Sequence, residues 1–134
     1  MHFIKTSAKF ESAHRLVGYE GKCHRLHGHN WRVDFQLSGS LKDGMVADFS
    51  ILKSMVKDDF DHRIILEDCT SNREIFEHFD SDWIKWVDFT PTAENLADYI
   101  AHKCMDWFEN LEKVRIYVWE NGKSHASREL FRKK

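Results

Sequence analysis

The sequence has no excess of charge of either sign, no long apolar run and few cysteines. Its 134 residues include 20 basic and 22 acidic side chains, so no overall field draws the chain toward nucleic acid or a membrane surface. No apolar stretch approaches the roughly 20 residues that span a bilayer, and the N-terminus lacks the pattern of a secretory signal. We therefore expect neither nucleic acid nor a membrane as a partner.

The three cysteines are an odd number at irregular spacing. This argues against a disulfide framework and favours a reducing, cytoplasmic location. Because no repeat, low-complexity tract or linker is present, residues 1–134 are expected to form one domain. What the sequence has in abundance is histidine, with nine residues. Histidine is the commonest metal ligand and the usual acid–base group near neutral pH.

Hydrophobic periodicity predicts four strands and two helices. The strands cover residues 2–12, 29–40, 113–120 and about 124–131, and the helices run from a cap at Asp48 or Ser50 to Phe60 and from the Thr90-Pro91-Thr92 start to about 110. Asn121-Gly122 predicts a two-residue hairpin turn between the last two strands. Residues 67–89 show no clear period. This order predicts an α+β fold with two helices on one face of a four-stranded antiparallel sheet.

The segment Cys23-His24-Arg25-Leu26-His27-Gly28-His29 carries the strongest functional signal. In an extended backbone, residues i and i+2 point to the same side, so His27 and His29 can direct two imidazoles at one point. His14, which closes the first apolar-rich segment (residues 10–14), is the best candidate for a third ligand. Three histidines without a fourth tight protein ligand leave one coordination position open, the arrangement of a catalytic zinc ion.

Six motifs resemble those of the 6-pyruvoyl-tetrahydropterin synthase family, which has the tunnelling fold. In chain order they are Phe10-x-x-Ala13-His14, Cys23-x-x-x-His27-Gly28-His29, Gly44-Met45-Val46-x-Asp48-Phe49, Asp61-His62, Pro91-Thr92-x-Glu94-Asn95 and Glu120. The three residues between Cys23 and His27 resemble the bacterial 6-carboxy-5,6,7,8-tetrahydropterin synthases of the queuosine pathway.

The resemblance implies a zinc lyase acting on 7,8-dihydroneopterin triphosphate, with loss of acetaldehyde and triphosphate. It also implies a homohexamer of two stacked trimers, in which strands close into a barrel and sites lie between subunits. The exposed edges of the predicted sheet independently favour sheet-to-sheet assembly.

The family assigns proton abstraction to Cys23 and a second acid–base role to Asp61 and His62. A thiolate near a cation titrates below its usual pKa of about 8.5, and a carboxylate beside an imidazole raises its basicity. Two roles remain open for Cys23, because a thiol close to metal-binding histidines is also a candidate for the fourth ligand of a closed structural site. Asp61 and His62 can likewise be a solvated cap at a helix end.

Glu120 follows an alternating strand and is the expected anchor of the pterin, because one carboxylate can accept two hydrogen bonds from an amino group and a neighbouring ring N–H. Thr92 and Glu94 match pterin-side positions of the family. Arg15, Lys22 and Arg25 flank the site in sequence and are expected to contribute to binding the triphosphate.

Two alternatives to a carboxy-forming enzyme remain. The first is 6-pyruvoyl-tetrahydropterin synthase activity on the same substrate. The second is a non-catalytic, zinc-stabilised binding domain, in which Cys23 is a metal ligand and no pocket surrounds Glu120.

Overall fold

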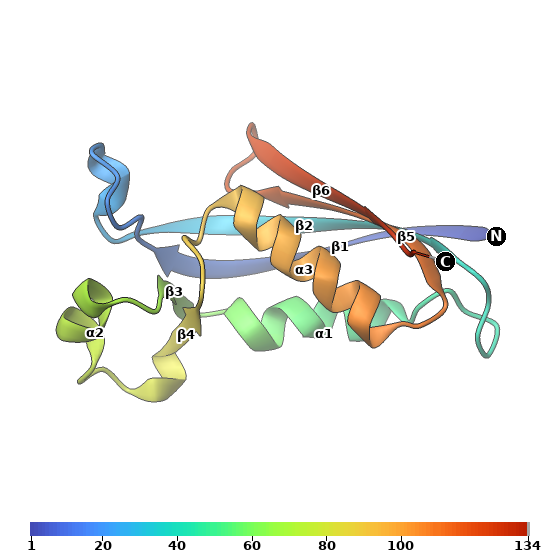
Figure 1. The fold of residues 1–134 in the computed structure, drawn as a ribbon, viewed down its shortest axis with the longest axis horizontal. Coiled ribbons are helices and arrows are strands. Elements are labelled where there is room, and N and C mark those ends of the chain that lie inside the picture. Colours follow the sequence, from blue (N-terminus) through green and yellow to red (C-terminus); the bar gives the residue numbers. More distant parts are fainter. Residues whose placement is uncertain (134) are drawn as a thin grey trace.

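A computed structural model of the chain describes residues 1–133, which form one mixed sheet and three α-helices (Figure 1). The strands are β1 (His2–His14), β2 (His27–Gly39), β3 (Arg63–Glu67), β4 (Ile84–Val87), β5 (Leu111–Trp119) and β6 (His125–Phe131). The helices are α1 (Phe49–Phe60), α2 (Thr70–Phe76) and α3 (Ala93–Trp107), with 3-10 turns at Lys22–His24 and Ser81–Trp83.

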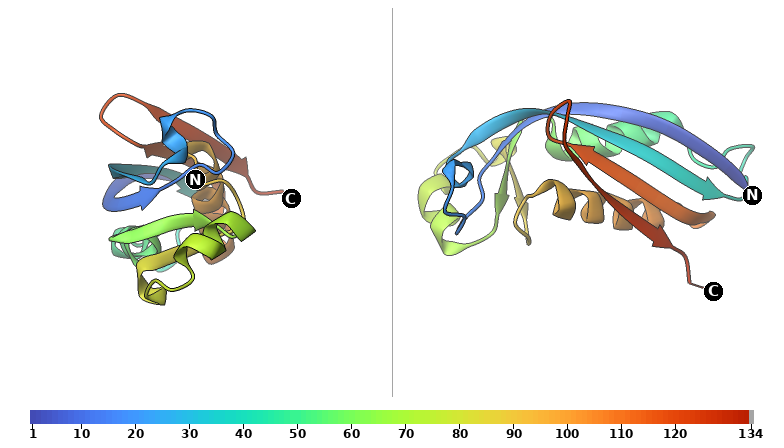
Figure 2. Two further views of the ribbon diagram at one scale, coloured as in Figure 1. Left: turned by 90° about the vertical axis from the view of Figure 1, so that its left-hand side faces the viewer. Right: turned by 90° about the horizontal axis from the view of Figure 1, so that it is seen from above.

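The sheet has the strand order β4-β3-β1-β2-β5-β6. The four predicted strands form its antiparallel part, β1-β2-β5-β6. The prediction of a four-stranded, purely antiparallel sheet is nevertheless wrong, because β3 pairs with β1 and β4 pairs with β3, both in parallel. The apolar run Ile64–Leu66 is too short to reveal a strand by its period, and its partners lie far away in the sequence. In Figure 2 (right) the strands curve along their length.

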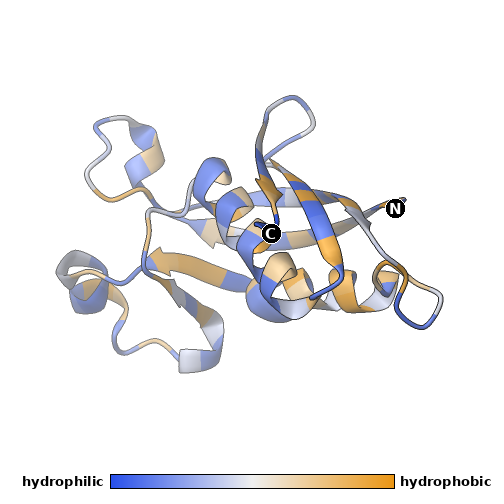
Figure 3. Cartoon of the chain, turned by 45° about the vertical axis from the view of Figure 1, so that its right-hand side comes forward, coloured by the Kyte–Doolittle hydropathy of each residue, from blue (hydrophilic) through white to orange (hydrophobic). Residues whose placement is uncertain are grey.

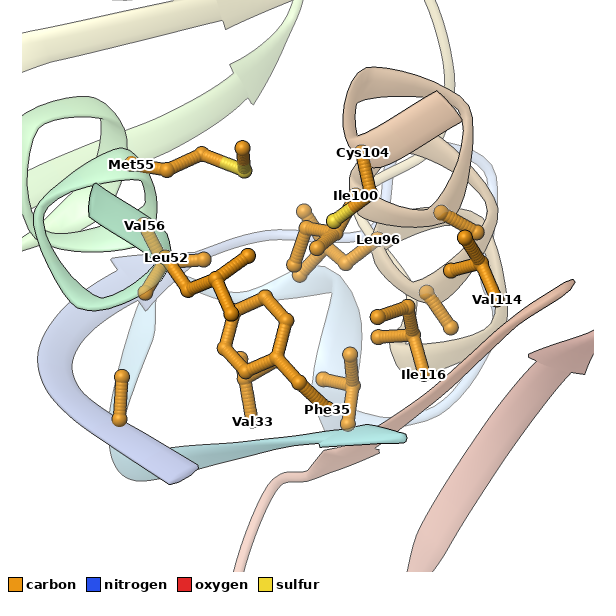
Figure 4. Packing of buried hydrophobic residues seen from close by; sticks show 14 of the residues in the cluster. Val33, Phe35, Leu52, Met55, Val56, Leu96, Ile100, Cys104, Val114 and Ile116 are labelled. Carbon is orange, nitrogen blue, oxygen red and sulfur yellow. The ribbon is translucent and has the colours of Figure 1, made fainter. Parts of the chain in front are cut away.

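The main core lies between one face of this sheet and helices α1 and α3. Hydrophobic and hydrophilic residues alternate along the strands, as the colours of the cartoon in Figure 3 show. Val33 and Phe35 of β2 meet Leu52 of α1 and Ile100 of α3 in the centre of this core (Figure 4), and all four are at most 1% exposed. The prediction that both helices cover the same face of the sheet is therefore confirmed.

Both predicted helices begin where the capping residues indicate. Asp48 accepts a hydrogen bond from Ser50 N, and Thr92 accepts one from Asn95 N. Such caps satisfy backbone donors that have no partner within the helix.

The hairpin between β5 and β6 also forms, but Trp119 pairs with His125, so the connection is longer than two residues. Asn121 closes it by accepting hydrogen bonds from the N–H groups of Lys123 and Ser124.

Residues 67–89, to which the sequence assigned no element, contain α2 and β4. A second, smaller core of Leu66, Phe76 and Ile84 holds this segment together. The Thr90 hydroxyl donates a hydrogen bond to the Glu67 carboxylate at 3.1 Å and so closes the segment at its two ends. None of the helices within residues 1–133 has the length and apolar character that crossing a bilayer requires.

Candidate metal centre and adjoining hollow

The register of β1 against β2 brings three imidazoles together. His14 pairs with His27, and Ser12 pairs with His29. Directly paired residues of antiparallel strands point to the same face, and so do residues i and i+2 of one strand. The result is a group in which one nitrogen each of His14, His27 and His29 lies within 4.8 Å of the other two. Gly28 adds no side chain between the two β2 histidines.

Backbone carbonyl groups orient two of these rings. Nδ1 of His14 lies 2.7 Å from Pro91 O, and Nδ1 of His27 lies 2.7 Å from Arg25 O. A carbonyl oxygen only accepts hydrogen bonds, so each Nδ1 carries the hydrogen and each neutral ring presents Nε2 as a lone pair. Metal-binding histidines in proteins are commonly fixed by such a bond on the outer nitrogen.

The two Nε2 atoms of His14 and His27 face each other at 3.0 Å. With both Nδ1 hydrogens committed, two neutral rings have no proton to share there, so two lone pairs meet. A cation between them removes this repulsion, and nitrogen ligands of tetrahedral zinc lie about 3.3 Å apart. The three histidines therefore fit a metal ion of the kind that imidazole prefers.

Burial keeps the His14 ring neutral. The side chain is 1% exposed, and burial lowers its pKa from 6.5 to about 4, with His27 and His29 acting in the same direction against the Pro91 hydrogen bond. Burial also lowers the pKa of His29, although the nearby Glu120 carboxylate opposes this shift. A ring that is neutral at pH 7 can bind a metal ion without first losing a proton.

The cluster opens into a hollow of about 420 Å³ that also contains Cys23 and Glu120. Its lining consists of His14, Leu16, Lys22, Cys23, Arg25, His27, His29 and Glu120. Cys23 is half-buried and does not belong to the group of mutually close ligand atoms. The hollow thus places a thiol, a carboxylate and two cations beside three histidines.

Asp61 and His62 lie outside this hollow in the single chain. The Asp61 carboxylate accepts hydrogen bonds from Glu11 N at 2.9 Å and lies 3.0 Å from His62 Nδ1. The Glu11 N–H holds the pKa of Asp61 below its usual value, with support from His62. The His62 side chain is 75% exposed and lines a different surface hollow, together with residues 28–30. The structure therefore does not bring this pair together with Cys23 within one chain.

Thr92 and Glu94 lie at the start of α3. The Thr92 hydroxyl caps the helix, and Glu94 is exposed in its first turn. Neither side chain lines the histidine hollow, although Pro91 beside them contacts His14. Pro91 was predicted as a helix-start residue and as part of a family motif, but its carbonyl contact has no signature in the sequence because the partner lies 77 positions away.

Arg15, which is expected to contribute to binding the triphosphate, is not among the residues that line the hollow. It donates hydrogen bonds to His24 O and to the side chain of Asn72. Lys22 and Arg25 remain as the cations of the hollow.

The curled sheet, the covering helices and the cluster of three histidines beside a thiol define an α+β protein with a candidate metal site at one end of its sheet. Comparison with known proteins gives the family. Residues 3–130 match the sequence profile of the family described as 6-pyruvoyl tetrahydropterin synthase. The chain is 36% identical over 138 residues to 6-carboxy-5,6,7,8-tetrahydropterin synthase of Haemophilus influenzae, covering 92% of this chain and 96% of that protein.

Solved structures of two 6-pyruvoyl tetrahydropterin synthases share the fold of this chain. The 6-pyruvoyl tetrahydropterin synthase of Plasmodium vivax superposes with a TM-score of 0.70 at 21% identity, covering 98% of this chain and 99% of that chain. The enzyme of Caenorhabditis elegans gives a TM-score of 0.61 at 28% identity, covering 95% and 94%. The protein belongs to the 6-pyruvoyl tetrahydropterin synthase family, and the resemblance inferred from its motifs is confirmed.

Proposed function

We propose that the protein is a zinc-dependent 6-carboxy-5,6,7,8-tetrahydropterin synthase of queuosine biosynthesis. It converts 7,8-dihydroneopterin triphosphate to 6-carboxy-5,6,7,8-tetrahydropterin, with loss of acetaldehyde and triphosphate. The observation that carries the proposal is the shared hollow, in which His14, His27 and His29 stand beside Cys23 and Glu120. The naming of the Haemophilus relative supports the carboxy-forming reaction over the pyruvoyl-forming one.

Each residue of the hollow has a role suited to this substrate. His14, His27 and His29 would hold the zinc ion, which when bound stabilises negative charge on the oxygens of the substrate side chain. Glu120 accepts hydrogen bonds from the amino group and ring N–H of the pterin. Lys22 and Arg25 line the hollow and contribute positive charge for the triphosphate.

Cys23 is the base that removes a proton from the substrate side chain. Its absence from the group of close ligand atoms supports this role over that of a fourth metal ligand. A cation nearby favours the thiolate, the reactive form of cysteine.

Asp61 and His62 are the second acid–base pair. Because they lie outside the hollow in a single chain, the pair acts on a substrate bound by a neighbouring subunit. A homohexamer with sites between subunits would supply this arrangement. Thr92 and Glu94 follow Pro91, whose carbonyl contacts His14. They are proposed to bind the pterin because they match pterin-side positions of the family.

Product analysis tests the proposal. Purified protein is incubated with 7,8-dihydroneopterin triphosphate, and the pterin product and acetaldehyde are identified by mass spectrometry. A carboxylated pterin with acetaldehyde is expected. A pyruvoyl product would instead identify the protein as a 6-pyruvoyl-tetrahydropterin synthase, and no product from zinc-loaded protein would favour the non-catalytic domain.

The variant Cys23→Ala separates the two roles of the thiol. We expect turnover to fall by at least about a hundredfold, the range typical for loss of a general base, while the zinc content stays equal to that of the wild type. Loss of bound zinc along with activity would identify Cys23 as a structural ligand.

A further inference from the structure

The segment that carries Cys23 is held largely by contacts within itself. It connects His14 at the end of β1 to His27 at the start of β2. Its backbone hydrogen bonds are local: Leu16 N donates to Cys23 O at 3.2 Å, and His24 N donates to Gly21 O at 3.2 Å. Tyr19 and Leu26 are 55% and 47% exposed. With so little apolar burial, the position of the thiol depends on whatever ties the segment to the rest of the protein.

Arg15 provides this tie. Its Nε donates to the carbonyl oxygen of His24 at 3.2 Å, and its Nη1 donates to Oδ1 of Asn72 at 2.8 Å. The first bond holds the residue next to Cys23, and the second reaches α2, in the part of the chain for which the sequence predicted no structure. In Figure 1 the Cys23 segment and α2 lie at the same end of the molecule.

Asn72 is a rigid acceptor for this bond. Its side chain is fully buried, and its Nδ2 donates to Glu67 O at 2.8 Å, which fixes the orientation of the amide. The carboxylate of Glu67 in turn accepts from Thr90, next to Pro91, whose carbonyl orients His14. One segment therefore supports both the metal-facing imidazole and the thiol segment.

We propose that Arg15 is a positioning residue, which, anchored by Asn72, holds Cys23 beside the histidine cluster. The planar guanidinium reaches the two acceptors from two different nitrogens, Nε and Nη1, held in a fixed fork, whereas an ammonium group would have to reach both from one nitrogen. The effect on turnover rests on the proposed function, but the effect on the order of the segment does not.

Three variants test the link: Arg15→Lys, Asn72→Ala and the double substitution. Amide hydrogen exchange at Leu16 and His24 reports opening of the segment, and steady-state kinetics with zinc-loaded protein report KM and kcat. Loss of one charge-assisted hydrogen bond should raise exchange at both amides by about tenfold. We expect kcat to fall by a similar factor with KM little changed, and the double variant to be no worse than the worse single one.

Arg15→Lys is the variant least apt to unfold the protein, since Asn72 is part of the interior. This variant keeps the positive charge, so it should retain activity if the role of Arg15 is to bind a phosphate. If Arg15 instead bridges His24 O and Asn72 Oδ1, the Arg15→Lys variant should lose activity despite its charge. Arg73→Ala is the matched control. Arg73 lies on α2, as Asn72 does, but it pairs with Asp68 at 2.7 and 2.9 Å and stacks over Trp86. We expect it to leave exchange at Leu16 and His24 unchanged.

Three results would overturn the proposal: unchanged exchange in Arg15→Lys, an equal rise in Arg73→Ala, or a higher KM at constant kcat. Because exchange is measured without substrate, it remains informative if the wild type proves to have no synthase activity. If exchange at Leu16 and His24 is faster in Arg15→Lys and the wild type has no synthase activity, the role of Arg15 in holding the segment is supported and only the proposed synthase function is refuted.

Discussion

Nδ1 of His14 donates a hydrogen bond of 2.7 Å to the carbonyl oxygen of Pro91, although 77 positions separate the two residues in the sequence. Pro91 lies immediately before the cap of α3, so the docking of this helix on the sheet determines how the ring of His14 is oriented. A carbonyl bond of this kind fixes the tautomer that leaves Nε2 available to a metal ion. The geometry of the candidate metal centre is therefore coupled to the packing of the domain.

Removing one imidazole should remove the metal. In His27→Gln the cluster retains two imidazoles, too few for tight zinc binding. After dialysis against zinc and then against zinc-free buffer, elemental analysis should find about one zinc per chain in the wild type and little in the variant. His102→Gln is the control, since His102 is exposed on α3 and, among residues 1–133, its side chain bonds only to Asp98. One zinc retained per chain in His27→Gln would contradict the assignment.

Stability of the metal-free protein should fall as the pH falls from about 6.5 to about 4. His14 has a pKa of about 4 in the fold and 6.5 as its ordinary value, so between these values the unfolded chain binds a proton that the folded chain does not. Stability is therefore complete above the higher value and is lost progressively down to the lower one, by about 3 kcal/mol at most.

Urea unfolding with a chelator present, at pH 7, 5.5 and 4.5, measures this effect. In His14→Gln the part of the pH dependence due to this ring should disappear, whereas His102→Gln should follow the wild type. Parallel curves for the wild type and His14→Gln would show that the buried ring does not control acid stability.

The three thiols should differ in reactivity toward iodoacetamide. Cys104 is fully buried on α3, and burial raises the pKa of its thiol to about 12. Because the thiolate is the reactive form, folded protein at pH 8 should be alkylated at Cys23 and Cys69, which are half-buried, and not at Cys104. Peptide mass spectrometry measures the pattern, and denatured protein should be modified at all three. Modification of Cys104 at the rate of the others would mean that the core opens readily.

Gly39 should not tolerate a side chain. At the end of β2, a β-carbon on this residue would overlap the carbonyl oxygen of Asn110 and lie 3.0 Å from Leu111 Cα. Both are backbone atoms next to an irregularity in the β2–β5 pairing, so they cannot move aside independently. Gly39→Ala should cost about 1–3 kcal/mol of unfolding free energy. Gly122→Ala, where the space is open, should stay within about 0.5 kcal/mol. Equal unfolding midpoints for Gly39→Ala and Gly122→Ala would refute the prediction that Gly39 has no room for a β-carbon.

The parts of the fold that the sequence predicted correctly have local causes. Alternating side chains define β1, β2, β5 and β6, and capping groups at Asp48 and Thr92 define the starts of two helices. The parts that it missed depend on distant partners: β3 is a strand because it pairs in parallel with β1, and β4 because it pairs in parallel with β3. Asn121 also shows the limit of a short motif, since it closes a loop longer than the predicted turn.

The candidate site divides in the same way. His27, His29 and Cys23 could be selected from their spacing, and His14 from its place at a strand end. The roles of Pro91 and Asn72 could not be found, because a backbone carbonyl and a buried amide carry no motif. Arg15 was expected to bind phosphate on the basis of its charge, and only its two acceptors in the fold indicate a different role.

The sequence by itself determined which chemical groups this protein carries and which of them share a strand face, because side-chain direction follows from a local period of two. Tertiary structure decided which groups meet: the β1–β2 register opposed His14 to His27, the docking of α3 oriented the His14 ring, and α2 supported Arg15. Those contacts join residues far apart along the chain, and their energies depend on burial and on partners that no local pattern records.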